Sequence, residues 1–154
     1  TIAGTKDFNP QRQLTRAEAA KILSLFAKNI LCRETTSTYS GGMFKDLAQT
    51  DEVSQSYLIL SYEYGIFHGD VGGMFRPNDI ISKDELTAVL IRLVMNEYNE
   101  TQGPNRAQNY RKLLENNASI PLNNVTRGNA AEVLYDLYKN NTYTLDTEVG
   151  FVLK

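Results

Sequence analysis

The 154-residue chain contains no tryptophan, one cysteine and one histidine. Because a disulfide needs two cysteines, Cys32 cannot form one within the chain. We interpret Cys32 as a structural thiol, with an intermolecular bridge as the alternative. The apolar runs are only a few residues long, whereas a transmembrane helix needs about 20 apolar residues. Residues 1–30 also lack the layout of a signal peptide, so we expect any secretion signal to lie upstream.

The chain also lacks a large excess of charge. It has 16 basic and 18 acidic residues, and its net charge is −2. The basic residues are scattered, which argues against a protein that binds nucleic acid or other polyanions through its overall charge. An acidic polymer that is bound in local grooves needs only a few fixed cations, so this class stays open.

The common catalytic motifs are absent as well. The sequence has no G-x-S-x-G, H-E-x-x-H, P-loop or Rossmann glycine pattern. His68 and Cys32 lie far apart in the sequence, which is a poor basis for a nucleophile and its base. The loop 69–79 lacks the ligand spacing of a calcium loop. We therefore expect no enzymatic activity, no metal and no cofactor.

What the chain does contain is a phrase of nine residues that recurs three times, beginning at Pro10, Pro77 and Pro121. Shifts of 67 and then 44 residues superpose the three phrases and the apolar positions after them. These positions are Ala19, Ile22, Leu23 and Phe26, then Leu86, Val89, Leu90 and Leu93, then Ala130, Val133, Leu134 and Leu137. Their spacing is that of an amphipathic helix, so a threefold repeat of such helices around a common core is predicted.

Each phrase predicts the start of a helix. Thr15 with Glu18 and Ser82 with Glu85 fit the capping box, in which the hydroxyl and the carboxylate satisfy free backbone N–H groups. Thr126 opens the third helix in the same way. The preceding prolines mark turns, because proline fixes its own backbone angle.

Shorter helices are predicted between the capped ones. One covers 53–64 and ends at Gly65, which suits a left-handed cap. Another covers 104–116, with Pro104 in its first turn. Residues 1–4 look like the end of the loop that follows Gly65, so the short helix of the first repeat is expected upstream of the chain.

In these motifs the chain resembles the S-layer homology (SLH) modules of bacterial cell-surface proteins. Those modules combine an F-x-D, a G-I-x-x-G loop, an F-x-P and an (I/L)-T-R-A-E at the start of a long helix. The corresponding segments are Phe44-Lys45-Asp46, Gly65-Ile66-Phe67-His68-Gly69, Phe75-Arg76-Pro77, Phe8-Asn9-Pro10 and Leu14-Thr15-Arg16-Ala17-Glu18. The resemblance covers residues 1 to about 142.

The resemblance implies an all-α fold of three SLH-like helix-loop-helix repeats in a pseudo-threefold, three-pronged bundle. Residues 1–154 would form a single domain. The repeats would cover about 1–32, without the first short helix, then 43–97 and 104–142, followed by a C-terminal extension, 143–154. The apolar segment Val149–Leu153 suggests that this extension packs on the bundle as a strand or an extended arm over the place of the absent helix.

The resemblance also implies a non-catalytic module that anchors a surface (S-layer) protein in the cell wall. Arg16, Lys83 and Arg127 would lie in grooves between the repeats and meet carboxylate-bearing sugars of a secondary cell-wall polymer. A guanidinium matches a carboxylate bidentately, whereas Lys83 offers only a point charge. Alternatively, these cations are solvated or pair with acidic residues of the protein. Further binding residues carried over from the family are Thr15, Thr126, Gly65, Gly69 and Asp46.

Two alternatives remain at this stage. One is a peptidoglycan-binding module, located in the periplasm rather than at the bacterial cell surface. The other is a degenerate SLH-like domain that self-associates or supports assembly and binds no glycan. Departures from the T-R-A-E motif at Ser82-Lys83-Asp84 and Asn129 favour the latter.

Overall fold

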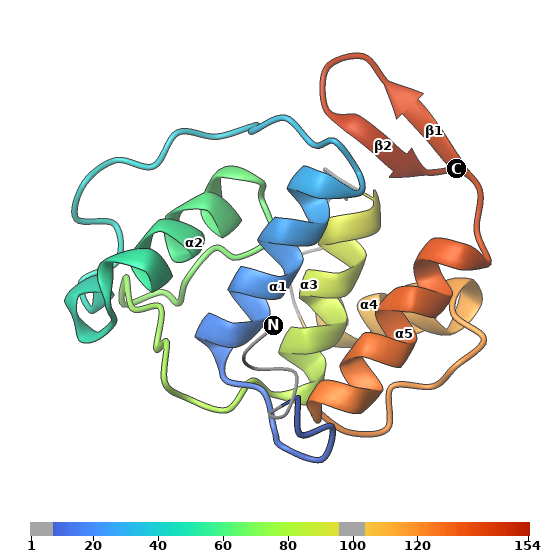
Figure 1. Ribbon diagram of the computed structural model, residues 1–154, viewed down its shortest axis with the longest axis horizontal. Helices are drawn as coiled ribbons and strands as arrows, with labels where there is room; N and C mark the ends of the chain where they lie inside the picture. The colour runs from blue at the N-terminus through green and yellow to red at the C-terminus, as the bar shows by residue number, and fades with distance from the viewer. Residues whose placement is uncertain (1–7, 96–103) are drawn as a thin grey trace, which may run out of the picture.

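The computed structural model describes residues 8–95 and 104–154 (Figure 1). Within these residues the fold is mainly helical, which confirms the predicted fold class. Its elements are α1 (Arg16–Asn29), the 3-10 turn η2 (Leu47–Gln49), α2 (Glu52–Glu63), α3 (Lys83–Met95), α4 (Arg106–Asn117), α5 (Arg127–Lys139), β1 (Tyr143–Asp146) and β2 (Gly150–Leu153). No helix in the described part of the chain is both long and apolar enough to cross a membrane.

The three helices predicted from the repeated phrase are α1, α3 and α5. The shorter helices α2 and α4 pack on α1 and α3 respectively, so each short helix contacts the long helix of the preceding repeat (Figure 1). The predicted apolar positions form the core: Leu23, Leu90 and Leu137 are all buried. Ile22 is an exception, because 42% of its surface is exposed.

The helix caps form as the sequence predicts. The Thr15 hydroxyl accepts a hydrogen bond from the Glu18 N–H (3.2 Å), and the Glu18 carboxylate accepts one from the Thr15 N–H (3.0 Å). Ser82 and Glu85 exchange the same pair of bonds, both of 3.1 Å. Thr126 caps α5. The three helix starts are therefore fixed by short-range chemistry.

Two local predictions need correction. Pro104 lies in a turn, and α4 begins two residues later, at Arg106, with Asn105 as its N-cap residue. Cys32 lies beyond the end of α1 with its thiol exposed, so it is not a structural thiol. By contrast, Gly65 follows α2 with a φ of 72°, as predicted for a left-handed cap.

The C-terminal extension is an antiparallel hairpin in which β1 pairs with β2. It packs on the bundle as its apolar sequence predicts, but at the C-terminal ends of α1 and α3 (Figure 1). The Phe151 N–H donates to the Leu31 carbonyl oxygen (2.8 Å), and the Glu34 N–H donates to the Val149 carbonyl oxygen (3.2 Å). These bonds tie the hairpin to the segment that leaves α1.

Candidate functional site

The repeated phrases meet one another through their backbones. The N–H groups of Arg16 and Ala17 donate to the carbonyl oxygens of Asp79 (2.9 Å) and Pro77 (3.0 Å) in the second repeat. In the same register, the N–H groups of Arg127 and Gly128 donate to Arg12 and Pro10 of the first repeat, both at 2.8 Å. The first helix start is thus held on the second repeat, and the third on the first.

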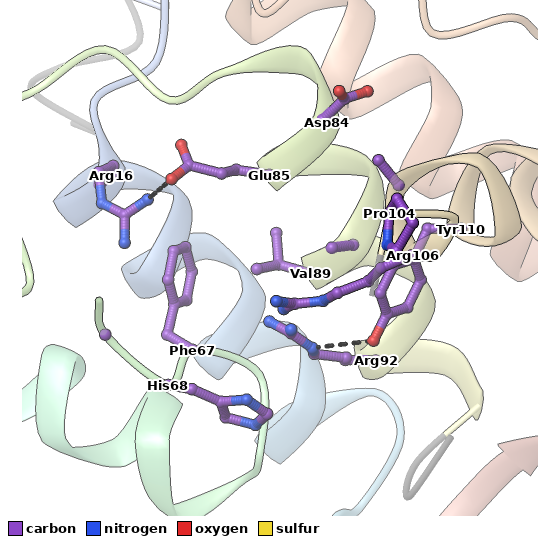
Figure 2. A pocket seen from close by; sticks show the side chains of 13 residues that line it. Arg16, Phe67, His68, Asp84, Glu85, Val89, Arg92, Pro104, Arg106 and Tyr110 are labelled. Atoms are coloured by element: carbon purple, nitrogen blue, oxygen red, sulfur yellow. Dashed lines mark hydrogen bonds and ion pairs between the residues drawn. The ribbon is translucent and has the colours of Figure 1, made fainter. Parts of the chain in front are cut away.

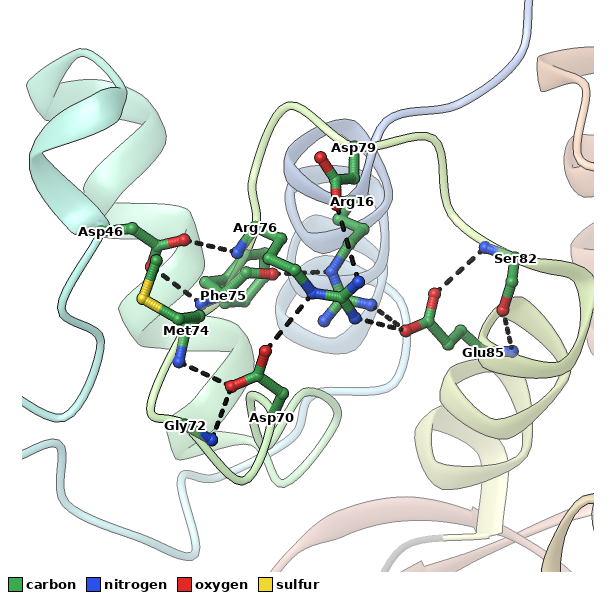
Figure 3. A network of polar contacts seen from close by, with 10 residues as sticks. All are labelled: Arg16, Asp46, Asp70, Gly72, Met74, Phe75, Arg76, Asp79, Ser82 and Glu85. Carbon is green, nitrogen blue, oxygen red and sulfur yellow. Dashed lines mark hydrogen bonds and ion pairs between the residues drawn. The ribbon is translucent and has the colours of Figure 1, made fainter.

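Arg16 lies at the first of these junctions and is buried, with 4% of its surface exposed. Its Nε donates to the Phe75 carbonyl oxygen (2.6 Å), and its Nη1 donates to Glu85 Oε1 (2.5 Å) (Figure 3). The guanidinium also lies over the rings of Phe67 and Phe75, 5.4 Å from each centroid. Glu85 therefore has two roles, because its carboxylate caps α3 and also accepts the hydrogen bond from Arg16.

Arg127 makes the equivalent contacts at the other junction. Its Nη1 donates to the Phe8 carbonyl oxygen (3.1 Å), and its Nη2 donates to Glu18 Oε1 (3.4 Å). Phe8 and Glu18 correspond to Phe75 and Glu85 in the repeat. In both cases an arginine binds the phenylalanine carbonyl and the capping glutamate of the repeat on which its own helix start is held. We call this arrangement the arginine latch.

Lys83 does not form a latch. The equivalent partner positions in the third repeat are Ser119 and Asn129. Asn129 turns to its own loop, where its Oδ1 accepts from the N–H groups of Asn123 (2.8 Å) and Asn124 (3.0 Å). Within the described residues, the Lys83 side chain makes no ion pair. Both the arginine and the glutamate of the latch are thus absent at the junction of repeats two and three, where the threefold pattern is broken.

The environment of Glu85 favours its charged form. Burial alone would raise the pKa of Glu85, but hydrogen bonds from Ser82 and the charge and hydrogen bond of Arg16 hold this pKa below its usual value of 4.5. A lowered pKa means that the native state favours the carboxylate. The stability that Glu85 contributes is therefore present above about pH 4.5 and is lost as the pH falls through the lowered pKa.

A pocket of about 380 Å³ opens beside Arg16 (Figure 2). Its walls come from the loop after α2, from α3 and from α4. The residues on these walls include Arg16, Phe67, His68, Gly69, Asp84, Glu85, Arg92, Arg106 and Tyr110. Arg16 Nη2 makes no hydrogen bond to the described residues, so this buried guanidinium keeps one nitrogen for a ligand. Three arginines and two carboxylates line the pocket, and one of the carboxylates, Glu85, already binds Arg16. The pocket therefore suits an anion.

Arg92 and Tyr110 are pocket residues that the sequence reasoning missed. Arg92 is 9% exposed, and its Nη1 donates to the Ile66 carbonyl oxygen (3.1 Å). Its Nε donates to the Tyr110 hydroxyl (3.3 Å). The signal was present, because Arg92 stands between Ile91 and Leu93 in an apolar run of α3. A charged residue within such a run is unusual unless it has polar partners.

Of the other predicted ligand residues, only Gly69 lines this pocket. Its φ is 76°, and a Cβ built there would lie 2.8 Å from Phe44 Cε1, so the position requires glycine. Gly65 serves the turn after α2, and Thr15 and Thr126 serve as caps. Lys83 lines a second pocket of about 460 Å³ beside Arg111, and Arg127 borders an apolar one of about 210 Å³.

Asp46 lies outside these pockets and holds the turn before α3. It is 4% exposed, and its carboxylate accepts from the N–H groups of Phe75 (2.8 Å) and Arg76 (2.7 Å) (Figure 3). The Phe75 carbonyl oxygen accepts the hydrogen bond from Arg16, so Asp46 stabilises the arginine latch by fixing the backbone of Phe75. Its effect on the site is indirect.

An Asp46→Ala variant is therefore expected to lower the free energy of unfolding by about 2–4 kcal/mol, because it leaves two backbone N–H groups without an acceptor. Chemical denaturation measures this loss. Asp51→Ala, which removes the exposed cap of α2, is the matched control and should cost clearly less. Equal losses in the two variants would contradict the role of Asp46 in the turn.

The described residues contain no group of three histidine, cysteine, aspartate or glutamate side chains that could hold a metal ion. Comparison with known proteins adds the decisive observation. Residues 38–87 match the model of the S-layer homology domain. This segment belongs to the S-layer homology family. The matched segment contains the F-x-D, the glycine loop, the F-x-P and the capping box of the second repeat. Of these, the glycine loop and Glu85 of the capping box line the Arg16 pocket.

Two curated relatives also contain matching segments. An amylopullulanase from Thermoanaerobacterium thermosulfurigenes is 31% identical over 157 residues, which cover 87% of this chain. Cell surface glycoprotein 1 from Acetivibrio thermocellus is 32% identical over 87 residues, which cover 56% of this chain. The aligned segments are only 8% and 4% of these two relatives. The names of the relatives therefore transfer no activity to this chain.

Proposed function

We propose that this SLH chain is a non-catalytic anchoring module that binds an acidic secondary cell-wall polymer through the Arg16 pocket and tethers a surface protein to the wall. The observation that carries the proposal is the buried Arg16, fixed by Phe75 and Glu85, with one nitrogen left for a ligand beside a pocket of about 380 Å³. The SLH family and the cell surface relative support a location at the bacterial cell wall.

The chemistry of the pocket suits a carboxylate-bearing sugar. A guanidinium that is already oriented loses little freedom when it binds a planar carboxylate, and such charge-assisted bonds are among the strongest in proteins. The pocket volume is near the lower end of the usual range for small ligands, about 300–1,000 Å³. Arg92 and Arg106 on the opposite wall add positive charge, which favours an acidic glycan over a neutral one.

The assembly function without a glycan remains a second candidate. The observation that favours it is the loss of the latch at Lys83 and Asn129, because a domain that binds sugars in several grooves would be expected to keep the arginine in each. On this view Arg16 and Arg127 only join the repeats. Concentration-dependent association without any dependence on glycan would be the expected behaviour.

Co-sedimentation with cell walls of the source organism separates these functions. The purified chain is expected to pellet with intact walls and to remain in the supernatant once acid extraction has removed the secondary polymers. Lys83→Gln should behave like the wild type, because Lys83 lies outside the Arg16 pocket. Binding that survives extraction would indicate peptidoglycan as the ligand, and no binding to any wall would support the assembly function.

A further inference from the structure

The Glu85 carboxylate binds a second arginine besides Arg16. Its Oε1 accepts hydrogen bonds from Arg16 Nη1 (2.5 Å) and from Arg76 Nη2 (3.3 Å) (Figure 3). Arg76 belongs to the turn before α3, and 44% of its side chain is exposed, whereas Arg16 is buried. One carboxylate oxygen therefore joins an exposed cation to the buried cation beside the pocket.

The other latch has the same arrangement, but its second arginine stands at a different position of the repeat. Glu18 Oε1 contacts Arg127 Nη2 (3.4 Å) and Arg12 Nη2 (2.8 Å). By the shift of 67 residues, Arg12 corresponds to Asp79 and not to Arg76. The sharing of the glutamate by two arginines is therefore not a by-product of the repeated phrase.

The third repeat, which has no latch, lacks the second arginine as well. The residues that correspond to Arg76 and Asp79 are Ile120 and Asn123, and Asn129 stands in place of the glutamate. A second arginine thus accompanies the glutamate in both repeats that have a latch, and it is missing in the repeat that has none. This joint occurrence links the second arginine to the latch rather than to the turn.

The backbone of Arg76 also indicates that its side chain has a role. Arg76 has a φ of 57°, in the left-handed region, where a residue other than glycine, asparagine or aspartate is uncommon. The equivalent residue of the first repeat is Asn9, with a φ of 37°. The second repeat thus has an arginine at a position that suits asparagine better. Such a strained position points to a functional constraint on the side chain.

Arg76 lies among carboxylates that would otherwise oppose an anionic ligand. Its guanidinium lies 3.5 Å from Asp70 Oδ2 and 3.6 Å from Asp79 Oδ2 (Figure 3). The pKa of Asp70 is held below its usual value of 3.8, mainly because the Met74 N–H donates to it and also because of the charge of Arg76. Without Arg76, these two carboxylates and that of the latch would surround Arg16 alone.

We propose that Arg76 is a positioning residue for the Arg16 pocket. It holds Glu85 from the solvent side and offsets the neighbouring carboxylates, so that Arg16 keeps a fixed orientation and a charge that an anionic ligand can use. Arg76 does not line the pocket, so it acts through Glu85 and Arg16. The inference rests on the proposed function and extends it to a residue that does not touch the ligand.

An Arg76→Asn variant separates this role from folding. Asparagine tolerates the left-handed φ, and exposed ion pairs contribute little to stability, so the melting temperature should stay close to that of the wild type. Calorimetric titration with the soluble wall polymer at low salt should show an affinity lower by about 3- to 10-fold. The loss should shrink at high salt, because salt screens exposed charges. Arg76→Lys should restore most of the affinity.

A double variant tests whether Arg76 acts through Arg16. In an Arg16→Gln background, Arg76→Asn should cause no further loss of affinity, because the group that it positions is absent. Arg12→Gln is the matched control, since it removes the second arginine of the other latch, outside the pocket, and should bind as the wild type does. Additive losses in the double variant, or the same loss in Arg12→Gln, would overturn the proposal.

A second readout needs no polymer. The Arg16 Nε–H is buried and donates to the Phe75 carbonyl oxygen (2.6 Å), so its proton exchange, followed by NMR, reports how firmly Arg16 is held. Arg76→Asn should speed this exchange at least about threefold, whereas Arg12→Gln should leave it unchanged. Unchanged exchange in Arg76→Asn would overturn the proposal. A wild-type chain that binds no polymer would instead overturn the proposed function, and the exchange rate would still decide whether Arg76 positions Arg16.

Discussion

Replacement of Arg16 by glutamine is expected to weaken binding of the acidic wall polymer by about 10- to 100-fold. Glutamine cannot supply the charged fork, and charge-assisted hydrogen bonds contribute about 1.5–3 kcal/mol, which corresponds to this range. The variant also removes the donor to Phe75 and Glu85, so some loss of stability is expected. Titration of soluble polymer, followed by calorimetry, measures the affinity.

Two further variants separate binding from folding. Arg16→Lys keeps the charge but loses the planar fork, so its affinity should fall between those of the wild type and Arg16→Gln. Arg12→Gln removes a nearby arginine that is 52% exposed and lies outside the pocket, and it should bind as the wild type does. A folded Arg16→Gln variant with wild-type affinity would contradict the role of Arg16.

Deletion of residues 143–154 is expected to lower the free energy of unfolding by about 2–4 kcal/mol. In a chain of this length, that corresponds to a melting temperature lower by about 4–16 °C. The hairpin closes the end of the core: Leu31 is 1% exposed, and its carbonyl oxygen accepts from Phe151. Calorimetry of the truncated chain measures the change.

The hairpin also shapes the surroundings of Arg33. Arg33 donates to the Leu93 carbonyl oxygen at the end of α3. Burial lowers the pKa of Arg33 to about 10, although Tyr143 and Asp146 of the hairpin act in the opposite direction. Burial also raises the pKa of Tyr143 to about 12. The hairpin therefore belongs to the folded unit, and a truncation that left the melting temperature unchanged would contradict this account.

A point substitution should reproduce part of the truncation effect. Gly150 has a φ of 93°, and a Cβ built there would lie 2.7 Å from the Leu31 carbonyl oxygen, so Gly150→Ala should push the hairpin off the bundle. Gly41→Ala is the matched control, because a Cβ at Gly41 meets no atom within 4 Å. Similar melting temperatures for the two variants would show that the hairpin contact is not needed.

The parts of the fold that follow from nearby residues could be predicted from the sequence. The capping boxes at Thr15 and Ser82 fixed two helix starts, and Gly65 fixed the end of α2. The docking of α2 and α4 on the helices of the preceding repeat could not be derived in this way. It depends on contacts between residues that are far apart in the sequence, and the amphipathic pattern specifies which face is buried but not which helix covers it.

The candidate site could likewise be predicted only in part from the sequence. The resemblance to SLH modules directed attention to Arg16, which does lie beside a pocket. The partnership of Arg16 with Glu85 joins residues that are 69 positions apart, and the capping motif explains Glu85 without it. Lys83 and Asn129 looked like two separate departures from the motif. They stand at the two ends of one latch position, so both departures concern the same contact.

The most direct test of carboxylate recognition is calorimetric titration of the wild-type chain with the soluble wall polymer before and after its carboxyl groups have been reduced to alcohols. Reduction keeps the sugar chain and removes the negative charge that Arg16 is proposed to bind. The account predicts saturable binding of the native polymer and a loss of binding after reduction. Equal affinity for the two polymers would contradict it.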